Sequence, residues 1–137
     1  MSRSALVRSA VLFLTASAVF GQSSTSIRVT VPFEFVAGQS SFTAGEYSVI
    51  SPAPGVVEIR NQNGSHAALV LANRAQLLHA PDTSELVFRV YGDRYFLSQI
   101  WTAGNAIGKE IPKSHAQRAW IAAHRSSRVV TVAATLR

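Results

Sequence analysis

A hairpin pattern between residues 85 and 102 places the strongest constraint on the fold. Two runs of alternating apolar and polar residues, 85–91 and 94–102, are joined by Gly92-Asp93. Alternation with period two is typical of strands that bury one face, and a Gly-Asp pair suits a two-residue turn. The facing pairs that this register predicts are Leu86–Gln99, Phe88–Leu97 and Val90–Tyr95. The predicted core face therefore carries a single amide, that of Gln99.

Five further stretches have strand character: 27–36, 47–50, 56–61, 65–71 and 128–133. In the first of them the odd-numbered positions are all apolar, and Pro32 lacks an amide hydrogen, so we expect an edge or an irregularity there. The loop around Gly64 leaves two registers for the second hairpin. A three-residue loop sets Val57 opposite Leu69, whereas a two-residue Asn-Gly turn sets Glu58 opposite Leu69. We prefer the first because it separates apolar from polar side chains better.

One helix is predicted after these strands, beginning at Ser114. Ser114 is a suitable N-cap, and Gln117 stands three residues later, as in a capping box. Ala116, Ala119, Trp120 and Ala123 share one side of this helix, which we expect to dock closely on a sheet. The predicted fold class is all-β, or mainly β with one helix. The architecture expected is a small antiparallel barrel or sandwich of about seven strands, with the helix packed on it.

The start of the chain has the pattern of a signal peptide. Basic residues precede an uncharged apolar stretch from Ser9 to Phe20, which is shorter than the roughly 20 apolar residues of a membrane span. Small residues allow cleavage after Ala18 or after Gly21. We therefore predict a signal peptide at 1–21, a single β-rich domain at 22–137, and export to the periplasm or the medium; the alternative is an anchoring helix. With no cysteine in the chain, an acylated-cysteine lipoprotein is excluded.

Positive charge is concentrated in the last quarter of the chain. Residues 22–108 carry five arginines and six acids, whereas residues 109–137 carry six bases and one acid. Such a segment is able to meet an anionic surface, or it serves only to solvate the protein. The residues expected to make contact are Lys113, Arg118, Arg125 and Arg128. Nucleic acid is not an expected partner, because no platform of interleaved basic and aromatic residues is present.

The usual catalytic and metal-binding patterns do not occur in the chain. The absence of cysteine removes thiolate nucleophiles, Cys-ligated zinc and iron–sulfur clusters. The four histidines lack zinc-protease spacing, and neither the Gly-x-Ser-x-Gly motif nor a glycine-rich phosphate loop occurs. We predict a protein that is not an enzyme and has no metal or cofactor. A hydrolase remains the third choice.

Binding is the function class that remains. Our first hypothesis is a non-enzymatic domain that has a binding or structural role in the cell envelope or outside the cell. The alternative is a small barrel that holds an apolar ligand in its interior. In that case Gln99 would orient the ligand, because a buried amide needs a hydrogen-bond partner, and Tyr95 and Trp101 would be its neighbours.

Three stretches also carry a resemblance. They are Val31-Pro32-Phe33-x-Phe35-x-x-Gly38 with Ala44-Gly45-x-Tyr47, then Leu86-Val87-Phe88-x-x-Tyr91-Gly92-Asp93-x-Tyr95-Phe96-Leu97-Ser98-x-x-Trp101, and finally Gly108-x-x-Ile111-Pro112-x-Ser114. Together they resemble a group of short, uncharacterised exported bacterial proteins over residues 29–118. The resemblance implies export and a β-rich domain, and it implies no activity or catalytic residue. From Arg125 onward the chain departs from the pattern of that group, which often ends in a charged helix.

Overall fold

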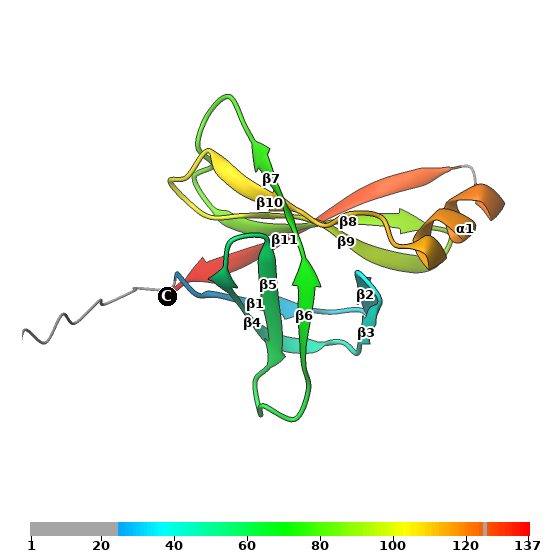
Figure 1. Cartoon of the computed structure of the whole chain (residues 1–137), viewed down its shortest axis with the longest axis horizontal. Helices are drawn as coiled ribbons and strands as arrows, with labels where there is room; N and C mark the ends of the chain where they lie inside the picture. The colour runs from blue at the N-terminus through cyan, green and yellow to red at the C-terminus, as the bar shows by residue number, and fades with distance from the viewer. Residues whose placement is uncertain (1–24, 125) are drawn as a thin grey trace, which may run out of the picture.

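The computed structural model describes residues 25–124 and 126–137, so the predicted signal peptide at 1–21 and Arg125 lie outside the described residues. This described part of the chain is mainly β with one helix, as expected (Figure 1). The elements are β1 (Ile27–Val31), β2 (Phe35–Ala37), β3 (Ser40–Phe42), β4 (Gly45–Ala53), β5 (Val56–Asn61), β6 (Ala67–Leu71), β7 (Asn73–Gln76), β8 (Ser84–Tyr91), β9 (Arg94–Trp101), β10 (Ile107–Glu110), α1 (His115–Ala123) and β11 (Ser127–Leu136).

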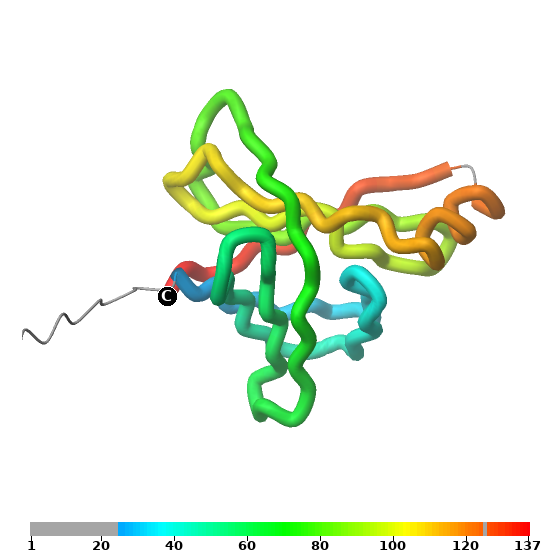
Figure 2. The backbone as a smooth tube through the Cα atoms, in the orientation of Figure 1, coloured from blue at the N-terminus to red at the C-terminus, as the bar shows by residue number. Residues whose placement is uncertain are grey.

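The strands form one sheet that curls into a nearly closed barrel. Its neighbour order is β3-β2-β9-β8-β11-β1-β4-β5-β6. Strand β6 continues through Ala72 into β7, as the tube in Figure 2 shows. Because β7 pairs with β10, and β10 pairs with the end of β9, the sheet returns to a strand already in it. This return path brings the two ends of the sheet together.

Two details of the predicted architecture are wrong. The sheet has 11 strands rather than about seven, because residues 35–37, 40–42, 73–76 and 107–110 form short strands of their own. The sheet is also mixed rather than purely antiparallel, since β2 runs parallel to β9. Such three- and four-residue strands are too short to show a periodic pattern in the sequence. They are strands because the barrel brings partners beside them.

The interior of the barrel is filled by aromatic and aliphatic side chains. The ring of Phe35 lies 5.0 Å from that of Phe42 and 5.4 Å from those of Tyr47 and Phe88, centroid to centroid. Such offset and edge-on contacts are favourable for aromatic rings. The predicted inward face of residues 27–35 is confirmed: Ile27, Val29, Val31 and Phe35 are buried, and Phe33 packs against them. Strand β1 ends before Pro32, as predicted from its missing amide hydrogen.

The preferred register of the second hairpin is wrong, and the other register is observed. Glu58 pairs with Leu69, Val57 with Val70, and Ile59 with Ala68. This register puts Val57, Ile59 and Val70 on the core side, and Ala72 continues that side into β7. The consequence is that Leu69 points to solvent and is 67% exposed.

The first hairpin follows the predicted register only in the half next to its turn. Phe88 faces Leu97 and Val90 faces Tyr95, as expected. A bulge then leaves Ser98 unpaired within this hairpin, so that Leu86 faces Ile100 rather than Gln99. Leu97 and Ile100 are three residues apart, and period two cannot place both on one face, so the bulge is what brings both to the core face. The predicted core amide is therefore wrong.

The helix begins as predicted but packs with a different side. The backbone N–H of Gln117 donates to the Ser114 hydroxyl at 3.1 Å, which confirms the cap. The expected alanine contact is wrong, since Ala116, Ala119 and Ala123 are exposed. Gln117 is buried and Trp120, Ile121 and His124 are half-buried instead. The helix lies beyond the turn of the β8–β9 hairpin and does not cover the sheet broadly (Figure 1).

Candidate functional site

The three residues predicted to bind a ligand do not form one site. The bulge turns Gln99 and Trp101 to the face that carries Glu85 and Val87, away from the core. There the buried Trp101 indole donates from Nε1 to Gln99 Oε1 at 3.2 Å. The amide that was expected to orient a ligand therefore has a partner within its own strand. Tyr95 lies apart from this pair, on the core face.

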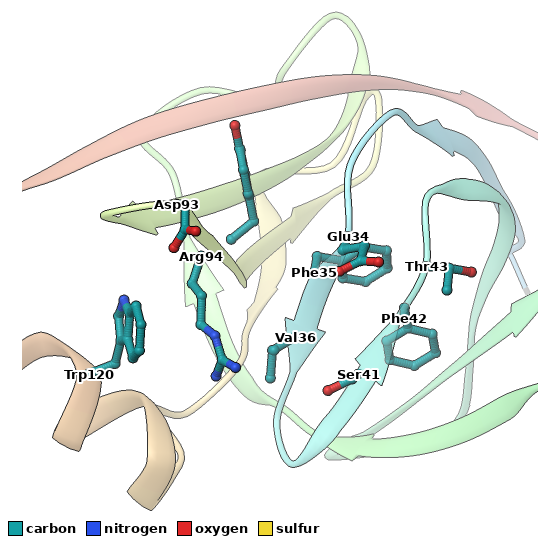
Figure 3. Close-up of a pocket in the computed structure, with 10 residues that line it drawn as sticks. Glu34, Phe35, Val36, Ser41, Phe42, Thr43, Asp93, Arg94 and Trp120 are labelled. Atoms are coloured by element: carbon teal, nitrogen blue, oxygen red, sulfur yellow. The ribbon is translucent and has the colours of Figure 1, made fainter.

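A cleft opens at the end of the molecule where Tyr95 lies. It has a volume of about 510 Å³ and is open to solvent. The β2–β3 hairpin forms one wall, the start of β9 lies in the middle, and α1 contributes a single residue from the other side (Figure 3). The lining residues are Glu34, Phe35, Val36, Ser41, Phe42, Thr43, Asp93, Arg94, Tyr95 and Trp120.

The turn of the β8–β9 hairpin carries two of the charged groups. Gly92 has a φ of 63°, in the left-handed region that glycine adopts readily, and the turn presents Asp93. Arg94 follows as the first residue of β9. Figure 3 shows its side chain pointing into the space between Trp120 and Val36. The third charged group, Glu34, is supplied by the neighbouring strand, because Phe35 pairs with Tyr95 and Glu34 immediately precedes it.

Trp120 is held firmly at the edge of the cleft. Its Nε1 donates to the carbonyl oxygen of Tyr91 at 2.6 Å, which anchors α1 to the hairpin. The His124 ring stacks on the indole with centroids 4.3 Å apart, and the Arg94 guanidinium carbon lies 4.8 Å from the indole centroid. A guanidinium over an exposed aromatic face gains about 0.5–1 kcal/mol. Arg94 is therefore positioned by packing rather than by an acid.

Tyr95 has a similar arrangement on the opposite face of β9. Its ring stacks on Phe33 with centroids 3.9 Å apart. Arg128 of β11 lies over the ring at 5.5 Å and donates to the Tyr95 hydroxyl at 3.0 Å. Arg128 was predicted to meet an anionic surface, and the structure places its guanidinium over the ring of Tyr95. Arg128 thus ties the Tyr95 side chain to β11.

Two of the other three residues of the predicted basic surface are described by the structure. Lys113 and Arg118 are exposed just before and on α1, and Arg125 lies outside the described residues. Sequence reasoning identified Tyr95 as a site residue but missed Glu34, Asp93, Arg94 and Trp120. These come from three separate segments that only the parallel β2–β9 pairing and the tethered helix bring together. No local pattern could have shown this.

The cleft offers acids, a base and hydroxyls that are not paired with one another. Within residues 25–124 and 126–137, the ion pair that the structure contains is Arg60–Glu58, on β5. The carboxylates of Glu34 and Asp93 accept hydrogen bonds, Arg94 donates, and the Ser41 and Thr43 hydroxyls do both. In the same part of the chain, no three His, Asp or Glu side chains are placed to hold a metal ion.

Comparison of the chain with models of protein families, with curated proteins and with solved structures gives no match. Among the helical residues that the structure describes, none belongs to a helix long and apolar enough to cross a membrane.

Proposed function

We propose that the protein is an exported, non-enzymatic binding domain whose cleft holds a hydroxyl-rich ligand, namely a glycan of the cell envelope. The observation that carries the proposal is the mixed lining of the cleft, with Glu34 and Asp93 as acceptors and Arg94 as donor. A sugar hydroxyl both donates and accepts, so a saccharide satisfies carboxylates, guanidinium and hydroxyls at once. A purely anionic ligand would meet two carboxylates, and a purely apolar one would leave all these groups unpaired.

Export is part of the proposal and is supported by the pattern of residues 1–21 and by the resemblance to short exported bacterial proteins. The alternative of an apolar ligand inside the barrel has less support. The face on which it relied carries Ile100 instead of Gln99, and four aromatic rings pack against one another inside the barrel. The surface cleft, in contrast, has volume and polar groups available for a ligand.

A test begins with an array of neutral and amino-sugar oligosaccharides probed with the domain. The best oligosaccharide is then titrated by calorimetry against the natural sequence, Arg94→Gln and Asp93→Asn. Each substitution removes a charge-assisted hydrogen bond, which is worth about 1.5–3 kcal/mol, so binding should weaken about tenfold or more. Arg60→Gln is the matched control, because Arg60 lies on β5 and pairs with Glu58. Equal affinity in all four proteins, or no binding on the array, would overturn the proposal.

The same sample also tests the non-enzymatic part of the proposal. Two carboxylates, Glu34 and Asp93, line the cleft, and glycosidases use such a pair. After prolonged incubation with the bound oligosaccharide, mass spectrometry should recover it intact. Shortened products that disappear in Glu34→Gln would show a hydrolase instead.

A further inference from the structure

Strand β11 has an open backbone edge over most of its length. It pairs with β8 from Ser127 to Ala134, but with β1 only at Ala134, Thr135 and Leu136. Residues 127–133 therefore have a strand partner on one side only, among the described residues. In the strand order β11 stands between β8 and β1. None of its ten residues is fully buried, which is unusual for a strand with a neighbour on each side. Its free N–H and C=O groups form a template for another strand.

The open edge follows from the sequence at the end of β1. Continuing the β1–β11 register past Val29 would carry β1 along β11, but Pro32 supplies no amide hydrogen for this ladder. Phe33 instead turns inward, where its ring stacks on Tyr95 and meets the edge of Phe88 at 4.9 Å. The segment after β1 thus crosses to β9 and leaves the edge of β11 uncovered.

The two strands at the ends of the sheet order have protected edges. Strands β3 and β6 end the sheet, and the segments next to them approach one another. A Cβ atom at Gly38 would lie 3.1 Å from Val70 Cγ1, and the rings of Phe42 and His66 have centroids 5.0 Å apart. Among residues 25–124 and 126–137, no strand covers the edge of β11 in this way. It also lacks proline, and it carries one charged residue over seven, so the usual devices against strand pairing are scarce.

We propose that residues 127–133 of β11 bind an extended, acidic peptide segment of another protein by strand addition. Main-chain hydrogen bonds supply the affinity in this mode, and alternate side chains supply the specificity. Inward-facing side chains of the peptide would cover Val130 and Val132, which are half-buried against the core. The outward-facing ones would lie beside Val129, which is 54% exposed.

The charges beside the edge favour an acidic partner. Arg128 lies on the edge itself, and the exposed Arg89 of β8 pairs with Val129 on the other face of the sheet. The acid that pairs with this part of β11 is Glu85, opposite Ala133 at the far end. The outward-facing acidic residues of the peptide are therefore expected near Arg89, on the face that carries Val129. A second copy of the chain would bring an equally basic segment, residues 109–137 with six bases and one acid, and is disfavoured by repulsion.

The test uses the domain with two seven-residue peptides of alternating valine and polar residues, one with glutamates and one with lysines as the polar residues. We expect saturable binding of the glutamate peptide at up to millimolar concentration, and binding of the lysine peptide at least tenfold weaker. Hydrogen exchange of the bound complex should slow at the amides of residues 127–133. N-methylation of alternate peptide amides on one edge should abolish binding, while methylation on the other edge leaves it unchanged, because only one edge of the peptide faces β11.

Arg89→Glu should weaken the glutamate peptide at least tenfold, because Arg89 is exposed on the face to which the glutamates point. Arg74→Glu, at an exposed strand arginine of β7, is the matched control and should change nothing. Arg94→Gln should also leave the peptide unaffected, which separates this site from the glycan cleft. No saturable binding, insensitivity to methylation on both edges, or protection located elsewhere would overturn the proposal. Concentration-dependent dimers with residues 127–133 protected in the absence of peptide would also overturn it, in favour of a second copy.

Discussion

Single positions in this barrel differ in how much change they tolerate, and Gly108 is expected to tolerate least. A Cβ atom there would lie 2.3 Å from Cε3 of the buried Trp101 and 2.6 Å from the carbonyl oxygen of Ile100. Neither neighbour is the free end of a flexible chain. Gly108→Ala should therefore lower the free energy of unfolding by at least ~1–3 kcal/mol, the usual range for overpacking. Gly45→Ala is the control, because its nearest neighbour would be 3.9 Å away. Equal denaturant midpoints for the two variants would contradict the packing of Trp101.

Phe88 and Leu97 provide the second test at the scale of residues. They are 0% and 1% exposed and face one another across β8 and β9. Phe88→Ala and Leu97→Ala should each cost ~2–5 kcal/mol of stability. Because the two side chains belong to one packed layer, the double variant should deviate from additivity by ~0.5–3 kcal/mol. Leu69→Ala, at an exposed position, is the control and should change the denaturant midpoint little. Additive losses of stability for Phe88→Ala and Leu97→Ala would show that the two side chains do not pack in one layer.

Among the elements, α1 is the one with the smallest support from the barrel. Its main tether is the hydrogen bond of 2.6 Å from the Trp120 indole to the Tyr91 carbonyl. Trp120→Phe keeps an aromatic ring and removes that donor. We expect faster hydrogen exchange across residues 115–123 with little change in exchange of the barrel strands, because local opening is governed by local contacts. Equal acceleration in β8 and β9 would mean that the helix is part of the cooperative core.

The sequence predicted those elements whose pattern is local and long. The strands at 56–61, 85–91 and 94–101, the helix start at Ser114 and the last strand all lie where expected, whereas the predicted strand 27–36 ends at Val31. The periodicity or the capping signal of these elements depends only on residues close to one another in the sequence. Strands β2, β3, β7 and β10 could not be predicted, since three or four residues become strands only when the barrel supplies partners.

The pairing register of two strands was predicted correctly only where the apolar face and the turn type favour the same register. Near the Gly92-Asp93 turn the hydrophobic face and the turn agree, and the register is confirmed. Farther along, strict alternation would place Leu97 and Ile100 on opposite faces of the strand. A bulge brings both to the core face, and Gln99 therefore lies on the other face, outside the expected site. The cleft escaped prediction for a related reason. Glu34, Arg94 and Trp120 come together only in the folded chain. Their spacing along the sequence therefore does not indicate that they line one cleft.

For the whole molecule, the first prediction concerns export. We expect the protein isolated from the envelope or the medium to begin at residue 19 or 22, because the apolar stretch up to Phe20 is too short to anchor stably. N-terminal sequencing measures this directly. A chain that still begins at residue 1 or 2 would show that the segment is retained, and the assignment to the periplasm or the medium would then be wrong.

The second whole-molecule prediction concerns the basic last quarter of the chain. Lys113 and Arg118 are exposed around α1, whereas the Arg128 guanidinium lies over Tyr95. If this end of the molecule meets an anionic surface, the two bases near α1 should contribute ~1 kcal/mol each, screened over a Debye length of about 8 Å at physiological salt. Reversing both charges, Lys113→Glu with Arg118→Glu, should therefore remove most co-sedimentation with anionic vesicles at low salt.

The control for this experiment is Arg74→Glu with Arg60→Glu, which changes the net charge equally but on β7 and β5. A general attraction by net charge would weaken both double variants alike, whereas a local surface would weaken only the pair around α1. Raising the salt to physiological strength should reduce adsorption of the natural sequence as well, because exposed charges are screened. If the natural sequence fails to co-sediment even at low salt, these side chains serve only to solvate the helix. The cleft lined by Arg94 and the edge of β11 would then remain as the proposed binding surfaces.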